Sequence, residues 1–262
     1  MRTALKILRY QLQDVARSRG VLIYLLLLLI TTDLLLRFGG GGPRAVISLL
    51  NVVLTLVPLV AVVFGTMYLY SAREFIELLL AQPVGRRSLF LGLYGGLALP
   101  LAIGFALVVF LPFLWHGAAV AAGGALLALI LAGVLLTLVF TAVAALSALA
   151  SDDRARGLAR ALAAWLACTV VYDAGVLLVV MLFGNASLER PLLGLVLLNP
   201  VDLARVLLLL RLDVAALMGY TGAVFSRYLG STTGSALTVT ALLFWTVAPL
   251  ALAARRFGRK DF

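Results

Sequence analysis

The stretch AAVAAGGALLALILAGVLLTLVFTAVAALSALA, residues 118–150, carries no charged side chain from one end to the other. A helix needs about 20 mostly apolar residues to cross the hydrocarbon core of a bilayer. This stretch is longer than that, so we expect its last turns, residues 146–150, to emerge into the cytoplasm. Other apolar stretches of spanning length lie along the chain at residues 20–38, 46–70, 88–115, 160–183 and 235–254. The sequence therefore predicts an all-α membrane protein with six transmembrane helices.

Composition supports a lipid environment. Of the 262 residues, 64% are hydrophobic and 12% are charged, whereas soluble domains average about 45–50% apolar and about 25% charged residues. The net charge of +10 comes from 21 basic and 11 acidic residues. We attribute it to basic residues on the cytoplasmic side of a membrane and not to nucleic-acid binding. Because the chain has one cysteine and one histidine, it offers neither a disulfide nor a metal site of its own.

The distribution of lysine and arginine predicts the orientation. If the N-terminus lies inside, 15 of the 21 basic residues fall on the cytoplasmic side and six fall outside. This asymmetry favours six spans with both termini cytoplasmic. The first apolar run follows a charged segment and no small-residue cleavage site closes it, so it is predicted to be a retained signal anchor. We expect a multi-pass protein of a bacterial or archaeal inner (cytoplasmic) membrane.

We predict one transmembrane domain, residues 1–262, with two appended features. Residues 1–19 place apolar side chains at helical spacing beside basic ones, which predicts an amphipathic interfacial helix at the lipid surface or against a cytoplasmic partner. Spans one to five then occupy residues 20–183, and span six with a basic tail occupies residues 235–262. Residues 184–234 are predicted to form an extracytoplasmic lobe.

The lobe contains a segment, residues 201–225, that is apolar enough to suggest a seventh span. It carries charges that cost about 2.5–3.5 kcal/mol each at a helix centre, and a seventh span would place the arginine-rich C-terminus outside. We therefore predict one or two amphipathic helices that lie on the membrane or against the other spans. Asn199 and Pro200 form a predicted helix start, with Asn199 as the cap.

The loop Ser71–Arg87 reads SAREFIELLLAQPVGRR and differs from a passive connection. It predicts a short helix with acidic groups in its first turns, where the helix dipole favours them. Pro83 ends that helix, and Arg86 and Arg87 are expected to anchor in anionic headgroups at the start of the next span. The loop is either a capped connector or a coupling helix that receives a cytoplasmic protein.

The loop resembles the segment after the second span of ABC-2-type permeases, where the pattern Glu-x-x-Glu-x-Leu-Leu-x-x-Pro-Val-x-Arg is common. Many members of that family have Gly-Thr or Gly-Ser where this chain has Phe75 and Ile76. The resemblance implies a separate cytoplasmic ATPase, which would bind the ATP and magnesium, and no cofactor on this chain. The residues implied to couple to that ATPase are Arg73, Glu74, Glu77, Leu78, Leu79, Pro83, Val84, Arg86 and Arg87.

A narrower resemblance is to the NosY-type permeases of nitrous-oxide-reductase maturation. The segments that carry it are residues 171–173, residues 199–205 and the tail, residues 253–262. This resemblance implies a homodimer bound to two ATPase copies. It also implies a periplasmic accessory protein that feeds assembly of the reductase's copper–sulfur centre. The residues implied to dock that protein are Asn199, Pro200, Asp202 and Arg205.

The sequence itself holds little catalytic chemistry. Its only lysines are Lys6 and Lys260 and no P-loop motif is present, so the chain is not expected to hydrolyse ATP or act as an enzyme. Tyr172 and Asp173 lie mid-span, where an ionisable group indicates either a pathway or polar packing. Two alternatives to a permease stay open: a proton- or ion-coupled secondary transporter that uses Asp173, and a non-transporting membrane scaffold.

Overall fold

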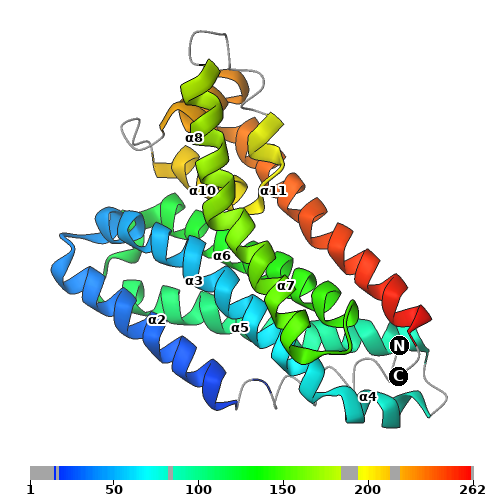
Figure 1. Cartoon of the computed structure of the whole chain (residues 1–262). Helices are drawn as coiled ribbons and strands as arrows, with labels where there is room; N and C mark the ends of the chain where they lie inside the picture. Colours follow the sequence, from blue (N-terminus) through cyan, green and yellow to red (C-terminus); the bar gives the residue numbers. More distant parts are fainter. Residues whose placement is uncertain (1–14, 16–17, 82–84, 184–193, 213–218, 261–262) are drawn as a thin grey trace.

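The computed structural model describes residues 15, 18–81, 85–183, 194–212 and 219–260, and of residues 219–231 the backbone alone. Within these ranges the chain is helical and forms no strand. Figure 1 shows long helices running between two ends of a tapered bundle. The helices are α2 (Arg19–Phe38), α3 (Gly42–Ser71), α4 (Arg73–Leu80), α5 (Arg86–Trp115), α6 (Ala119–Leu149), α7 (Arg154–Leu166), a π-helical segment (Ala167–Val171), α8 (Tyr172–Phe183), α10 (Pro200–Leu212) and α11 (Gly219–Arg259).

The prediction of six spans is confirmed. Six helices are long and apolar enough to cross a membrane, and each overlaps one predicted stretch. The fifth, Arg154–Leu182, joins α7, the π-helical segment and α8. The predicted interfacial helix, residues 1–19, lies almost entirely outside the described residues.

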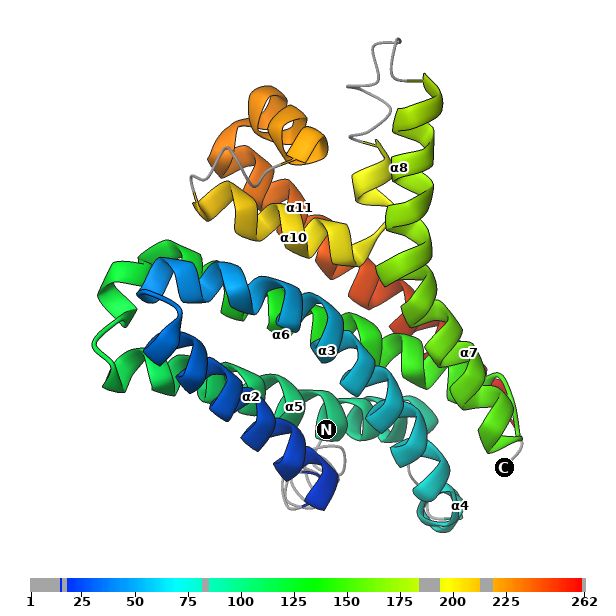
Figure 2. The same cartoon turned by 60° about the vertical axis from the view of Figure 1, so that its left-hand side comes forward.

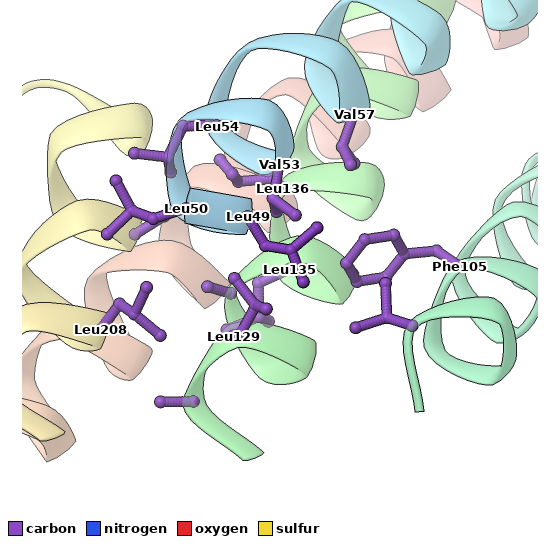
Figure 3. Close-up of a cluster of buried hydrophobic side chains, with 14 of the residues drawn as sticks. Leu49, Leu50, Val53, Leu54, Val57, Phe105, Leu129, Leu135, Leu136 and Leu208 are labelled. Atoms are coloured by element: carbon purple, nitrogen blue, oxygen red, sulfur yellow. The ribbon is translucent and has the colours of Figure 1, made fainter. Parts of the chain in front are cut away.

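Helix α6 forms the centre of the bundle and packs against α3, α5, α7, α10 and α11. Figure 3 shows the resulting core, in which leucines and valines of α3 and α6 meet Phe105 of α5 and Leu208 of α10. Gly133 of α6 permits this approach, because a Cβ there would collide with the ring of Phe105. The uncharged stretch of residues 118–150 therefore supplies the central helix of this core.

The insertion before the last span differs in one respect from the prediction. Helix α10 has 13 residues, or about 20 Å at 1.5 Å per residue, too short to cross a bilayer. It packs against α3, α6 and α11, and nearly every residue from Pro200 to Leu210 is buried. The prediction placed such a helix on the membrane or against the other spans, and the structure has it against the other spans. It differs in that Asp202 is buried and pairs with Arg205, so little of a polar face is left exposed.

Helix α11 is longer than the predicted last span. Its 41 residues correspond to about 61 Å, about twice the hydrocarbon thickness of a bilayer. The part of α11 nearer its start packs along α10, as far as Trp245, whose indole donates to the carbonyl of Leu197, and the other end lies near α4 and the C-terminus (Figures 1 and 2). We call these the α10 end and the α4 end of the bundle. One helix, bent near its start in both views, therefore joins them.

Candidate functional site

Helix α4 lies between α3 and α5 and presents two different faces. Its inward residue Ile76 is 2% exposed and packs in a small hydrophobic cluster with Phe90 of α5 and Phe257 of α11. The opposite face carries Glu74 and Glu77 beside two large apolar side chains, and all four are exposed. The exposed apolar residues are Phe75 and Leu78. Helix α4 is thus packed on the bundle through Ile76. Its exposed face is both acidic and apolar, which suits contact with a partner protein.

The start of α4 is tied to the last residues of α11 through Asp152, in the loop between α6 and α7. Arg73 forms an ion pair with the Asp152 carboxylate, and the Lys260 ammonium lies 2.9 Å from the same carboxylate oxygen. Hydrogen bonds from Lys260 and Arg73 hold the pKa of Asp152 below its ordinary value. The Lys260 ammonium also donates to the carbonyl of Leu149. One carboxylate therefore joins α4, α6 and α11.

Arg86 strengthens this junction in a way that the sequence analysis did not predict. Its guanidinium donates to the carbonyls of Gly258 and Lys260, at 3.3 and 3.0 Å. Arg86 thus satisfies carbonyls at the negative end of the α11 dipole, a role beyond the headgroup contact that was predicted for it. Arg87 is exposed. Pro83 and Val84 lie outside the described residues.

Tyr70, near the end of α3, fixes the same loop. Its hydroxyl donates to the carbonyls of Ser151 and Asp153, at 2.8 and 3.1 Å. Gly157 of α7 lies directly against the tyrosine ring and hydroxyl, where a Cβ has no room. The Asp153 carboxylate caps α7 by accepting from the Ala155 N–H at 3.0 Å. The loop that carries Asp152 is thus held from both sides.

A second polar cluster lies where the fifth span meets α10. The Arg205 guanidinium donates to both carboxylate oxygens of Asp173, at 2.9 and 3.4 Å, and to Asp202 at 2.8 Å. Sequence analysis left Asp173 to either a pathway or polar packing and placed Asp202 and Arg205 in a docking surface. The structure brings them together, so that Arg205 links the two carboxylates and the two helices.

Asn199 completes the cluster. Its amide group donates to Asp202 at 3.0 Å and to the carbonyl of Cys168 at 2.8 Å, in the π-helical segment. Its side-chain oxygen accepts from the Val201 N–H at 3.1 Å, so the predicted cap at the start of α10 is observed. The Tyr172 hydroxyl donates to the carbonyl of Leu195 at 2.6 Å. π-Helical turns within α-helices often occur at functional positions.

Burial decides what this cluster can contact. Asn199 is 1% exposed and Asp202 is 9% exposed, so these side chains face the fifth span and not an outside partner. Burial raises the pKa of Asp202 to about 6, against the opposing charge of Arg205. Asp173 is engaged by a guanidinium, an arrangement suited to polar packing between helices.

A third set of polar contacts lies in the last two turns of α2. Asp33 pairs with Arg37 at 2.8 Å. It also accepts from the Trp115 indole at 3.1 Å and lies 2.8 Å from the imidazole Nε2 of His116. These contacts join α2 to the end of α5. Among the described residues no group of three metal-ligating side chains is present.

Sequence reasoning missed Asp152 and Lys260 as a junction. One signal was available, because Asp152 belongs to an Asp-Asp pair in a short loop of a chain that has only 11 acidic residues. Their pairing required the tertiary structure, since the two residues are more than a hundred positions apart.

Six apolar helices around one core define a multi-pass helical membrane protein. The family model of the ABC-2 family transporter protein matches residues 46–262. A curated protein of Pseudomonas aeruginosa, named "Probable ABC transporter permease protein NosY", is 32% identical over 230 residues, which cover 83% of this chain and 81% of that protein. The chain belongs to the ABC-2 family of transporter permeases. It is therefore the membrane subunit of an ABC transporter, and its family implies a separate ATPase subunit.

Proposed function

We propose that this permease transmits the motion of a cytoplasmic ATPase along α11 to its α10 end, as one half of a homodimer that carries two ATPase copies. The observation that carries the proposal is a continuous series of contacts. Arg73 of α4 binds Asp152, Asp152 binds Lys260 directly after α11, and α11 packs against α10. Force applied to α4 would thus reach the Asp173–Arg205 ion pair through helices that contact one another.

The exposed face of α4 is the proposed point of contact with the ATPase. Glu74 and Glu77 form no ion pair with any described residue, so both charges are available to a partner. Ile76 clamps the helix to the bundle, so that a push on the exposed face displaces the cluster around Phe257 as well. The positive charge of the α4 end supports a cytoplasmic orientation for it.

The homodimer is supported by the fifth span. In the most apolar 18-residue stretch of Arg154–Leu182, no residue is buried within the chain. The Asp173 and Arg205 side chains on and beside it are 38% and 34% exposed. Charged groups within a membrane almost always face a bundle interior or a water-filled cavity. A second copy packed along this span would cover the apolar face and the remaining exposure of the ion pair.

The biological role that these features support best is assembly of the copper–sulfur centre of nitrous oxide reductase. The support is the 32% identity to a NosY permease, together with the tail and the cluster around Asp173 that first indicated this subfamily. In this role, motion at the α10 end would be transmitted to a periplasmic accessory protein. Because Asn199 and Asp202 are buried, they would shape that surface from beneath.

Co-purification tests the ATPase contact. A tagged full-length chain is extracted in mild detergent from its own host, and bound proteins are identified and quantified by mass spectrometry. We expect a P-loop ATPase at equal stoichiometry with the wild-type chain and a large loss with Glu74→Arg/Glu77→Arg. The matched control, Arg156→Glu, reverses an exposed charge at the same end and should retain the ATPase. Equal retention by the α4 variant would contradict the proposed contact.

A further inference from the structure

A basic groove lies at the α4 end beside the last turns of α11. It has a volume of about 510 Å³ and is bounded by the α6–α7 loop on one side and by α11 on the other. Three arginines of α11 line it: Arg255, Arg256 and Arg259. All three are exposed, and none of their guanidinium groups forms a hydrogen bond or ion pair with the described part of the chain. The volume falls within the usual range of about 300–1,000 Å³ for small-molecule sites.

Among the residues that the structure describes, no acidic side chain neutralises these three arginines. The acidic residue of the groove, Asp152, already accepts from Lys260 and Arg73. The three guanidinium groups therefore keep their full positive charge and face an open volume. An anion would find several charge-assisted hydrogen bonds there, because guanidinium groups match the oxygens of phosphates and carboxylates.

The depth of the groove favours a lipid as the source of that anion. The last span, Thr232–Arg259, has 28 residues and is about 42 Å long, close to the 40–45 Å of a bilayer with its headgroups. Its final arginines thus lie at headgroup level. Leu252, which also lines the groove, is 50% exposed one turn nearer the membrane centre. The groove is basic where phosphates lie and apolar where acyl chains begin.

We propose that this groove binds the headgroup of an anionic phospholipid, with the acyl chains passing over Leu252. The bound lipid would neutralise the tail of α11 beside the Asp152–Lys260 junction. The proposal does not depend on an ATPase, whose contact is assigned to the acidic face of α4. Basic pockets between transmembrane helices on the cytoplasmic side commonly hold anionic headgroups.

Lipid binding to the purified, delipidated full-length chain tests the proposal. Dioleoyl phosphatidylglycerol, dioleoyl phosphatidylcholine and free glycerol phosphate are added separately, and bound molecules are counted by native mass spectrometry. The wild-type chain should bind phosphatidylglycerol in preference to the other two. Arg255→Gln/Arg259→Gln should weaken this binding about tenfold or more. Arg154→Gln/Arg156→Gln, which removes two charges from α7 at the same end, should not.

A charge-preserving variant keeps the test valid if the glutamine variant folds poorly. Arg255→Lys/Arg259→Lys retains both charges and should keep most of the preference for phosphatidylglycerol. Equal binding of the two phospholipids, equal binding of free glycerol phosphate, or an equal loss in the α7 control would each overturn the proposal. Loss of the ATPase from the groove variant with unchanged lipid binding would assign the groove to that protein instead.

Discussion

The ion pair between Asp173 and Arg205 gives the sharpest test of how α10 is held to the fifth span. Hydrogen bonds to charged groups contribute about 1.5–3 kcal/mol when buried, whereas exposed ion pairs contribute about 0–1 kcal/mol. Here two hydrogen bonds of 2.9 and 3.4 Å join side chains that are each about a third exposed. We therefore expect a coupling free energy of about 1–2 kcal/mol between the two residues.

The coupling is measured as a double-mutant cycle with Asp173→Asn, Arg205→Gln and the double variant. Unfolding is followed by the loss of helical circular dichroism in micelles with a rising fraction of a denaturing detergent. The Arg205→Gln variant alone should lose the most stability, about 2–3 kcal/mol, because it also removes the partner of Asp202 at 2.8 Å.

The double variant separates a real contact from two unrelated losses. Because the two single variants break the same contact, the double variant should be more stable than the sum of the two single losses predicts. Additive losses, with a coupling below about 0.3 kcal/mol, lie within the error of independent sites. That result would refute the argument that this pair ties α10 to α8.

Three further predictions follow from the two polar clusters. Asp152→Asn should leave the ATPase bound and turning over ATP, because α4 itself is unchanged. It should lower the proposed reductase maturation, which depends on motion at the α10 end, because the α4–α11 junction is weakened. Gly157→Ala should lower the melting temperature, since the added methyl displaces Tyr70 from the loop carbonyls. In a Tyr70→Phe background, the same substitution should lower the melting temperature less. Asp202 should make stability fall as pH rises from about 4 to about 6, because the folded chain holds a proton that the unfolded chain has released; Asp202→Asn should remove this slope in unfolding free energy, and an unchanged slope would assign it to another group.

The sequence was sufficient for the parts of the fold that hydrophobicity and charge determine. Six spans followed from the apolar stretches, and the start of α10 followed from Asn199 and Pro200, because caps are local. The ion pair of Asp33 and Arg37 is local in the same sense, because the two residues lie one helical turn apart. In each case the information lies within a few residues of the feature.

The parts that failed depend on contacts between distant residues. The charges in α10 left open whether the helix lies on the membrane or against the other spans, and two of them, Asp202 and Arg205, prove to be paired within the protein. A buried charge with a partner on another helix has the same local sequence as an exposed one. Similarly, Arg86 looked like a headgroup anchor until the C-terminus of α11 was placed beside it.

The central claim is that motion at α4 reaches the α10 end through α11, and an inter-protomer distance measures this directly. Leu198 is exposed next to the start of α10. A nitroxide is attached there through Leu198→Cys, in a chain whose own cysteine is removed by Cys168→Ser, and the labelled chain is studied in the complex with its ATPase. Pulsed dipolar spectroscopy then compares the nucleotide-free state with the ATP-trapped state. We expect the distance distribution to shift with ATP and to shift less with Asp152→Asn. An unchanged distribution in a complex that hydrolyses ATP normally would contradict the account.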